Sequence, residues 1–318
     1  MLSHTPLLSP THPARLNPER AFLTDDDATV LRFAAEALAA SMAAVLVTLV
    51  EIRGGAARPL GAQMAVREDG FYCGFVSGGC VEAAVAYEAM EVMATGQDRE
   101  VVYGDGSPYF DIVLTCGGGI TLSLHKLETA QPLLAVLNNL ERRKPGGLRY
   151  TPRSQTLQSI SPTRSTGWNQ ATFEIYYRPC PRVLVYGRSV EAQATATIAQ
   201  AAGYDVHMSD GFQPRAGALM DADTAVVLLC HDLHRELPVL HAALAANPFY
   251  IGALGSQRTH GKRMLRLREL GWRSADIARI KAPIGLFPKA RDAHSLALSI
   301  LAEVAAVRLG GISDEAAT

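Results

Sequence analysis

The spacing of apolar residues at the start of the chain predicts a helix followed by a strand. After the acidic segment 25–27, apolar side chains recur at Val30, Phe33 and Ala37 with helical spacing, and the carboxylates suit the positive end of the helix dipole. The next run, 43–53, is apolar and rich in β-branched residues, which is typical of a buried strand. Both elements are apolar enough to contribute to a core.

The rest of the first half continues this mixture of elements. Two short strand patterns flank Asp69-Gly70, a dipeptide that favours the tight turn of a hairpin. A glycine-rich segment, 77–80, then opens a helical stretch that ends at Gly96. Further strands are expected at 99–105, 110–116 and 120–127, and a further helix at about 130–143. Strands and helices in this order predict an α+β domain.

The second half of the chain has a different pattern. Residues 145–171 are rich in Ser, Thr, Pro, Gln and Gly and lack periodicity, so we expect hinge and surface loops with room for a short hairpin. Beyond them, strands are expected at 182–187, 205–210, 224–230, 249–255 and 282–286, with helices between them and a final helix at about 293–308. This alternation predicts βαβ units and a parallel sheet.

These patterns predict an α/β protein with an N-terminal α+β domain and a C-terminal parallel-sheet domain of the Rossmann type. Three prolines within the first thirteen residues indicate that the chain begins with a disordered extension. The predicted parts are this extension over residues 1–24, the N-terminal domain over 25–144, a linker with a hairpin over 145–179 and the C-terminal domain over 180–310.

Composition narrows the classes of function. Hydrophobic residues make up 48% of the 318 residues, which excludes a largely disordered chain. The 30 basic and 31 acidic residues nearly balance, which argues against a nucleic-acid partner. The longest apolar stretch, 42–50, is too short to cross a bilayer, and an odd count of five cysteines without a CxxC motif suits a reducing compartment. We expect a cytoplasmic protein with no membrane partner.

The segment around Cys80 is the first candidate for chemistry. Gly78 and Gly79 precede Cys80 at a predicted strand-to-helix turn, where glycines let a ligand reach the backbone and the helix start offers N–H groups. A cysteine at such a helix start tends to be thiolate-like, and thiolates are soft metal ligands. The alternative is a buried small residue at a tight turn.

A second cysteine, Cys116, lies in a similar glycine loop. Gly117, Gly118 and Gly119 follow it, and consecutive backbone amides in such a loop can form an anion-binding concavity. The alternative is a flexible hairpin without a ligand. Two cysteine-and-glycine loops in one small domain favour the interpretation that both belong to a binding site.

Basic residues next to glycine turns are further candidates. Arg53 and Arg58 surround a glycine turn and would suit a phosphate or a pterin-like anion, although a solvated loop is the alternative. In the second half, Gly255 and Ser256 end a predicted strand, and Arg258 follows at a helix start, which makes a plausible phosphate cradle. Four basic residues further along this helix, Lys262, Arg263, Arg266 and Arg268, are expected on a solvated face.

The first βα turn of the second half is a poor match to a dinucleotide-binding fingerprint. That motif needs three glycines, but Gly187 alone is present, and Ser189 stands where the backbone should approach a pyrophosphate. Glu191 adds negative charge to the same helix start. We therefore expect a Rossmann-type domain without a nicotinamide cofactor.

Several long segments resemble the XdhC/CoxI family, the accessory proteins of xanthine dehydrogenase and carbon monoxide dehydrogenase maturation. They are VEIRGGAARPLGAQMAVREDGFYCGFVSGGCVE (50–82), TCGGG (115–119), YIGALGSQRTHGKRMLRLRELG (250–271) and APIGL (282–286), and the resemblance runs from about residue 28 to 308. This sequence departs from the family's usual pattern in having fewer glycines after Gly187, and Phe287-Pro288-Lys289 where an acidic residue and a Thr-Pro helix start are common.

The resemblance implies a non-enzymatic role. Family members bind and protect the molybdenum cofactor, assist its sulfuration and insert it into an apo molybdenum hydroxylase. The Gly79-Cys80 and Cys116-Gly117 loops match the cysteine motifs of the family's N-terminal domain, and the turn at Gly255, Ser256 and Arg258 matches the signature of its C-terminal domain. The candidate metal ligands are therefore Cys80 and Cys116, and which of the two contacts the metal stays open. The further candidates for binding the cofactor, as molybdopterin or its cytosine dinucleotide form, are Gly78, Gly79, Gly117, Gly118, Arg53, Gly255, Ser256 and Arg258. Family analogy suggests a homodimer, with a cysteine desulfurase as a possible partner.

Two alternatives stay open at this point. One is an NAD(P)-dependent oxidoreductase that uses the Rossmann half, against which the reduced glycine fingerprint speaks. The other is a sulfur-relay protein in which Cys80 or Cys116 carries persulfide from a cysteine desulfurase, a role that is compatible with that of a carrier.

Overall fold

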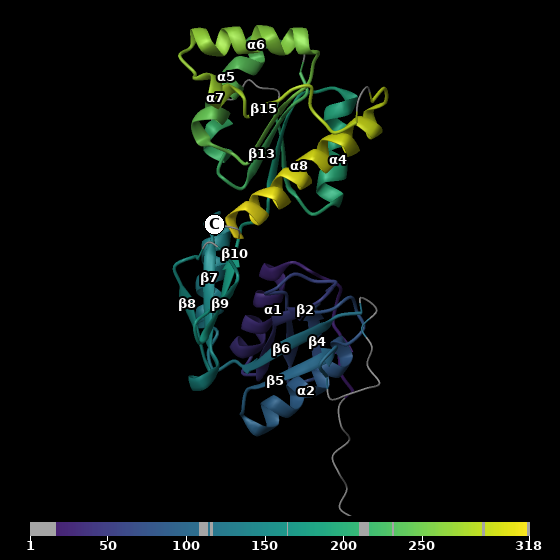
Figure 1. Ribbon diagram of the computed structural model, residues 1–318, viewed down its shortest axis with the longest axis vertical. Coiled ribbons are helices and arrows are strands. Elements are labelled where there is room, and N and C mark those ends of the chain that lie inside the picture. The colour runs from purple at the N-terminus through teal and green to yellow at the C-terminus, as the bar shows by residue number, and fades with distance from the viewer. Residues whose placement is uncertain are drawn as a thin grey trace, which may run out of the picture. The chain divides into compact units, whose positions relative to one another are not determined.

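The computed structural model confirms the predicted α/β fold class and divides the chain into two compact units, Met1–Tyr177 and Arg178–Thr318 (Figure 1). The structure describes residues 17–107, 114, 117–163, 165–209, 216–230, 232–287 and 290–316, with side chains described as far as residue 310. The predicted strand at 110–116 lies outside the described residues apart from Leu114.

Unit 1 contains a six-stranded mixed sheet with the order β1-β4-β3-β2-β6-β5. Its strands are β1 (Glu19–Arg20), β2 (Ala44–Arg53), β3 (Gln63–Arg67), β4 (Phe71–Gly74), β5 (Arg99–Gly104) and β6 (Gly119–Lys126). All neighbours are antiparallel except β1 and β4, and the hairpin predicted at Asp69-Gly70 joins β3 to β4. β1 lies within residues 1–24, which we expected to be disordered; its backbone pairs with the open edge of β4.

Helices cover both faces of this sheet because its strands are apolar on both sides. α1 (Asp27–Ala39) and α3 (Gln131–Glu141) share one core with Leu46 and Val50 of β2. α2 (Glu82–Thr95) packs on the other face, in a core with Val45 and Val47. Alternate residues of one strand thus face opposite cores, as the twofold period of a strand requires.

Residues 146–177 form a second sheet, where we expected a linker with a hairpin. The strands β7 (Gly146–Thr151), β8 (Thr156–Ile160), β9 (Gly167–Asn169) and β10 (Thr172–Tyr177) pair antiparallel in the order β8-β7-β10-β9. Leu148, Phe173, Ile175 and Tyr177 are buried and extend the core of α1 and α3. This segment is polar because one face of the sheet is exposed and because β8 and β9 are edge strands. The alternation of apolar and polar residues that would predict strands is therefore weak in the sequence.

Unit 2 contains a five-stranded parallel sheet with the order β12-β11-β13-β14-β15. Its strands are β11 (Arg182–Tyr186), β12 (Asp205–Ser209), β13 (Thr224–Leu228), β14 (Tyr250–Ala253) and β15 (Ile280–Lys281). The helices are α4 (Val190–Ala201), α5 (Leu233–Ala246), α6 (Gln257–Glu269), α7 (Ser274–Ile277) and α8 (Ala293–Ala316). Helices between successive parallel strands are the arrangement that the second half of the sequence predicts.

The last strand begins earlier than expected. β15 ends at Lys281, and the predicted strand at 282–286 is a bent loop with a cis peptide bond between Ala282 and Pro283. Pro283 has no N–H to donate to a sheet, and the N–H of Gly285 donates to the Glu303 carboxylate at 2.8 Å. The prediction of a strand here was therefore wrong.

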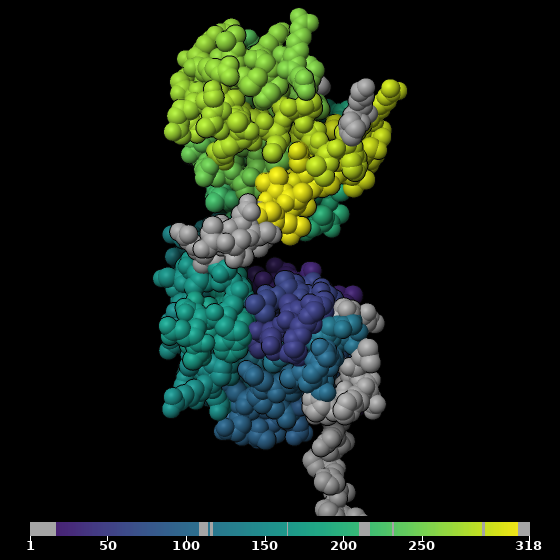
Figure 2. Space-filling view, in the orientation of Figure 1, coloured from purple at the N-terminus to yellow at the C-terminus, as the bar shows by residue number. Residues whose placement is uncertain are grey.

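α8 is apolar along most of its length. Of the residues that the structure describes, 293–310 form a helix that is long and apolar enough to cross a membrane by those two measures alone. Ile300 and Val304 are completely buried in the unit 2 core, whereas one flank of the helix, drawn yellow, is at the surface in Figure 2. Of this 293–310 stretch, 28% is buried in the structure.

Candidate functional site

The loop between β4 and α2 exposes Cys80. Gly79 has a left-handed backbone with φ +98°, and a side chain added there would meet nothing within 4 Å. Gly78, Gly79 and Cys80 are exposed, whereas Ser77 and Val81 on either side of them are buried. The loop thus presents a short stretch of backbone and one thiol, held at both ends by the core.

Glu82 holds this loop in place. Its side chain is 1% exposed, and one carboxylate oxygen accepts the backbone N–H groups of Val76 and Ser77 at 3.2 and 2.8 Å. The other oxygen accepts the N–H of Val81 at 3.2 Å, and the Ser77 hydroxyl lies 3.0 and 2.9 Å from the two oxygens. The Ser77 hydroxyl in turn accepts the N–H of Cys80 at 3.2 Å. The sequence analysis did not identify Glu82 as a residue that holds the loop. A carboxylate directly after a glycine loop, at the start of a helix, was the pattern that could have indicated this role.

The anchoring of the Cys80 loop limits which amides can meet a ligand. The N–H groups of Val76, Ser77, Cys80 and Val81 all have acceptors within the loop and Glu82. An incoming anion would therefore meet the exposed segment at Gly78 and Gly79 and the thiol, rather than a full nest of amides.

A second group of glycines lies where three loops pack backbone against backbone. A Cβ on Gly118 would lie 2.2 Å from the carbonyl oxygen of Gly55, and one on Gly104 would lie 2.2 Å from the carbonyl oxygen of Gly118. A Cβ on Gly119 would lie 2.1 Å from the carbonyl oxygen of Asp105. Gly118 is therefore required by packing, whatever else it contacts. Gly117, with φ +70°, has open space around it.

Arg53 supports the same junction of loops. Its Nε and Nη2 both donate to the Asp105 carbonyl at 3.1 Å, and its Nη1 donates to Thr121 at 2.8 Å and to the Glu51 carboxylate at 2.5 Å. The structure thus gives every guanidinium nitrogen an acceptor within the protein. A role for Arg53 in cofactor binding would require it to leave some of these partners.

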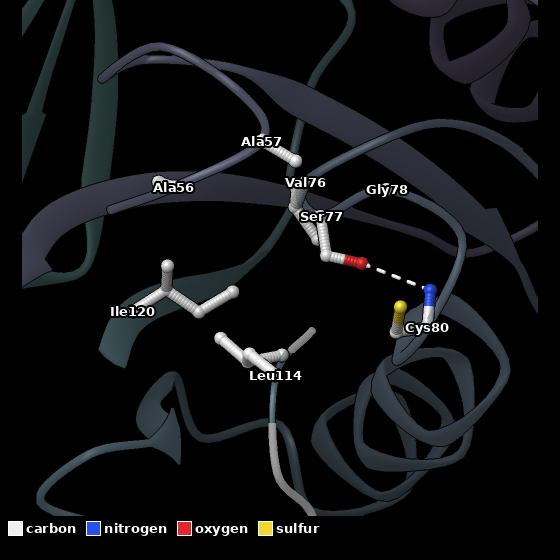
Figure 3. A pocket seen from close by; sticks show the side chains of 8 residues that line it. All are labelled: Ala56, Ala57, Val76, Ser77, Gly78, Cys80, Leu114 and Ile120. Carbon is white, nitrogen blue, oxygen red and sulfur yellow. Dashed lines mark hydrogen bonds between the residues drawn. The ribbon is translucent and has the colours of Figure 1, made fainter. Parts of the chain in front are cut away.

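A small pocket opens beside the Cys80 loop (Figure 3). It is lined by Ala56, Ala57, Val76, Ser77, Gly78, Cys80, Leu114 and Ile120. Its cavity volume of about 10 Å³ is room for about one water molecule. In Figure 3, Cys80 lies at one side of the pocket and Ile120 at the other. The lining side chains are apolar apart from Ser77 and Cys80, and the Ser77 hydroxyl is bonded to Glu82 and the N–H of Cys80, so the thiol is the most reactive lining group.

The second predicted cysteine, Cys116, lies outside the described residues. Its neighbours in sequence are described: the N–H of Gly117 donates to the carbonyl of Leu114 at 2.8 Å, and Leu114 lines the pocket beside Cys80. The described residues thus bring Cys80, Gly78 and Leu114 to one pocket. In the same part of the chain, no three His, Cys, Asp or Glu side chains form a metal-binding group.

The other described cysteines have different surroundings. Cys73 is fully buried, and burial raises the pKa of its thiol to about 12, which makes it unreactive. Burial and the nearby Glu236 charge also raise the pKa of Cys230. Cys180 is exposed, but its sulfur lies 3.3 Å from the carbonyl of Gly203 and it is not in a glycine loop. Cys80 alone among these four combines exposure with a glycine loop and a pocket.

In unit 2, the predicted turn after β14 caps a helix. The Ser256 hydroxyl accepts the N–H of Thr259 at 3.3 Å, so Ser256 is the N-cap of α6, and Gly255 has φ +130°. Arg258 is exposed on the first turn of this helix. Gly255, Ser256 and Arg258 are therefore adjacent at the carboxyl edge of the parallel sheet, and they lie in a different unit from Cys80.

Arg263 lies in the interior behind this turn. It is 0% exposed and forms a two-point ion pair with the buried Glu236, at 2.5 Å from Nε and 2.9 Å from Nη2. It also donates to the carbonyl of Leu254. We expected Arg263 on a solvated face, and that prediction was wrong because its partner carboxylate, 27 residues away on α5, is not visible in the local pattern.

The first βα turn of unit 2 is built around its own serine. Ser189 caps α4 and accepts the N–H of Ala192 at 3.3 Å, and Glu191 lies in the first turn of the helix. A Cβ on Gly187 would lie 2.7 Å from the carbonyl oxygen of Leu229, so this glycine is required by the close approach of the two strand ends. The helix start thus carries a capping hydroxyl and a nearby carboxylate.

These features define a protein with a cysteine loop on an N-terminal mixed-sheet unit and a Rossmann domain as its C-terminal unit. A family model for the XdhC and CoxI family matches residues 37–104, and one for the XdhC Rossmann domain matches residues 183–304. Together with the relative described next, these matches show that the chain belongs to the XdhC and CoxI family, as the sequence resemblance predicted.

One relative is highly similar over most of the chain. The molybdenum cofactor insertion chaperone PaoD of Escherichia coli (strain K12) is 68% identical over 292 residues, which cover 92% of this chain and 92% of that protein. A protein of Bacillus subtilis (strain 168) that is described as a probable xanthine dehydrogenase subunit is 24% identical over 83% of this chain and 93% of its own length. A crystal structure titled as a xanthine dehydrogenase from Bacillus halodurans has a TM-score of 0.67 at 22% identity, covering 88% of this chain and 96% of that chain, which shows a shared fold.

Proposed function

We propose that this protein binds the molybdenum cofactor and inserts it into the apo form of a molybdenum hydroxylase. The proposal is supported by 68% identity, over 92% of the chain, to a protein named as a molybdenum cofactor insertion chaperone. The structural observation that carries it is an exposed cysteine in a glycine loop whose geometry is held by a buried carboxylate.

The chemistry of the loop suits such a cargo. The cofactor presents molybdenum on a dithiolene and a phosphate-bearing pterin, and a thiolate is a soft ligand of the kind that such a metal accepts. The exposed backbone at Gly79 allows close approach of the ligand beside Cys80. Because the adjoining pocket holds about 10 Å³, the metal end of the cargo is expected at the mouth of the pocket and not inside it.

An insertion role needs no catalytic acid and base. The proposal therefore assigns the protein a non-enzymatic function. The turn after β11 supports this choice over a nicotinamide-dependent oxidoreductase: Ser189 caps α4 itself, and the Glu191 carboxylate in the first turn would repel a pyrophosphate there.

We propose in addition that Cys80 can assist sulfuration of the cargo. The exposed Cys80 sulfur would attack the outer sulfur of a persulfide on a cysteine desulfurase; a persulfide forms on Cys80, the sulfur–sulfur bond of the desulfurase breaks, and the proton of the Cys80 thiol passes to the released desulfurase sulfur. Intact-mass spectrometry after incubation with a desulfurase and cysteine tests this step. Gain of one sulfur atom by the wild type and not by Cys80→Ser is expected, and equal gain by both would contradict it.

Retention of the cofactor tests the main proposal. The purified protein is mixed with freshly released cofactor, as molybdopterin or as its cytosine dinucleotide, and desalted, and the co-eluting molybdenum and pterin are quantified. Near-stoichiometric retention is expected for the wild type and a large loss for Cys80→Ser. Cys180→Ser is the matched control because Cys180 is also exposed but lies in unit 2, outside the loop. Equal retention by Cys80→Ser and the wild type would exclude ligation by Cys80.

A further inference from the structure

A short segment near the start of the chain lies against the edge of the unit 1 sheet, and the proposed function does not use it. It comprises residues 17–22, which include β1, and we call it the N-terminal strap. The N–H groups of Glu19 and Ala21 donate to backbone carbonyls of the β3–β4 turn and of β4, at 3.0 and 2.9 Å. Because β4 is the strand that leads into the Cys80 loop, the strap borders one flank of that loop.

Arg20 joins the strap to the residues that precede the Cys80 loop. Its guanidinium carbon lies 5.0 Å from the centroid of the Phe75 ring and 5.8 Å from that of the Tyr72 ring. In the part of the chain that the structure describes, this guanidinium forms no ion pair, so the two aromatic rings are its partners. Phe75 is half-buried and directly precedes Val76, whose N–H is bonded to Glu82. Arg20 therefore holds the residue after which the loop begins.

Two further contacts join the strap to helices. The Tyr87 hydroxyl, on the second turn of α2, donates to Oδ1 of Asn17 at 2.6 Å. The ring of Phe22 packs edge to face against Phe33 of α1, with 5.7 Å between the ring centroids. Because α2 begins directly after the Cys80 loop, the strap contacts the chain on both sides of the loop, before it at Phe75 and after it at Tyr87.

We propose that the N-terminal strap keeps the Cys80 loop in its anchored conformation, that Arg20 is the positioning residue, and that opening of the loop limits how fast bound cofactor leaves. This inference rests on the proposed function, because it names what controls release from the same site. Glu82 holds the loop from the core, whereas the strap holds its two flanks. Both residues of β1 are exposed, so the loss of one strap contact changes local opening without unfolding unit 1.

Hydrogen exchange of the full-length protein, followed by mass spectrometry, measures opening of the loop. The informative amides are those of Val76, Ser77, Cys80 and Val81, since each is hydrogen-bonded in the anchored conformation. We expect Arg20→Met to raise their exchange rate about two- to fivefold, the factor that corresponds to a cation–π contact at an exposed site. Arg20→Lys keeps a charge over the rings and should exchange at close to the wild-type rate.

Two other variants separate the flanks of the loop from the rest of the sheet edge. Tyr87→Phe removes the hydrogen bond to Asn17 and should raise exchange in the loop about as much as Arg20→Met. Arg67→Met is the matched control: Arg67 also stacks over an aromatic ring, 5.1 Å from its centroid, and pairs with Asp69, but it lies at the turn that precedes β4. This variant should be less stable than the wild type and leave exchange in the loop unchanged, whereas a general contribution of Arg20 to stability predicts the same exchange in both arginine variants.

Release of bound cofactor supplies the functional readout. The wild type and the variants are loaded with molybdenum cofactor and desalted, and the loss of pterin to a scavenger is followed over time. Arg20→Met should release the cofactor about two- to fivefold faster, in the same proportion as the increase in loop exchange. Arg20→Lys and Arg67→Met should match the wild type.

Three results would overturn the inference. Equal loop exchange in the wild type and Arg20→Met, or an equal increase in Arg67→Met, would show that the strap does not position the loop. Faster loop exchange with unchanged release of cofactor would show that loop opening does not limit release. No retention of cofactor by the wild type would refute the proposed function together with the release step, and hydrogen exchange would still decide whether the strap holds the loop.

Discussion

Replacement of Glu82 tests whether this buried carboxylate holds the Cys80 loop. In Glu82→Gln, the amide oxygen can keep the N–H groups of Val76 and Ser77, but the amide nitrogen then faces the N–H of Val81, which keeps only its longer bond of 3.4 Å to the Ser77 hydroxyl. A buried donor that loses its better acceptor costs about 1–3 kcal/mol, and the remaining bonds lose their charge assistance. We therefore expect a loss of about 2–3 kcal/mol in the free energy of unfolding. Glu82→Ala removes every acceptor, and we expect a loss of about 4 kcal/mol.

Urea unfolding followed by circular dichroism measures these differences. The matched control is Glu88→Gln on the same helix, because Glu88 is partly exposed and pairs with Arg99 at the surface, where such a pair contributes about 0–1 kcal/mol. A Glu82→Gln variant within about 0.5 kcal/mol of the wild type would refute the reasoning. A variant that is destabilised but retains cofactor as well as the wild type would show that the anchoring of the loop matters for stability and not for binding.

Two further predictions concern unit 1. Gly118→Ala should lose about 3 kcal/mol of unfolding free energy, because its Cβ would lie 2.2 Å from the Gly55 carbonyl oxygen. Gly117→Ala should lose only about 1 kcal/mol, because Gly117 has open space around it and only its φ of +70° disfavours a side chain. Equal losses of the two variants in urea unfolding would contradict this packing. Burial tends to raise the pKa of Asp98, but the hydrogen bond and charge of His125 outweigh burial and lower this pKa. The ionised Asp98 carboxylate therefore stabilises the folded protein at pH values above its unfolded pKa of about 3.9. This stabilisation is lost as the pH falls through the lower folded pKa. Asp98→Asn should therefore be less stable at neutral pH and lose less stability on acidification, and unchanged unfolding midpoints from pH 6 to pH 2 relative to the wild type would count against this role.

The fold was predictable wherever local periodicity and turn chemistry agree. The Asp69-Gly70 turn, the helix that ends at Gly96 and the strand–helix alternation of unit 2 are all local patterns, and the structure contains each of them. The sheet of β7–β10 was not predictable in this way, because its buried residues alternate with polar ones on an exposed face. The loop after β15 was likewise mispredicted as a strand. Pro283 belongs to an apolar run, but it has no N–H to donate to a neighbouring strand.

The residues of the candidate site were predictable from the sequence, but the hydrogen bonds that hold them were not. Sequence reasoning singled out the Cys80 loop, and the structure shows it exposed beside a pocket. It did not find that Glu82 takes up most of the loop amides, or that Arg53 is fully engaged by Asp105, Thr121 and Glu51. These bonds join residues that are distant in sequence or adjacent to glycine turns, so no periodic pattern indicates them.

The most direct test of the central claim is transfer of the cargo. The wild-type protein is loaded with cofactor, desalted and mixed with an apo molybdenum hydroxylase in the presence of a scavenger of released cofactor, and the activity of the hydroxylase is followed. We expect the loaded wild type to activate the apoenzyme. Cys80→Ser, prepared in the same way, should give little activation, and Cys180→Ser should match the wild type. Activation that the scavenger abolishes for the wild type, or that Cys80→Ser supports equally well, would contradict the account.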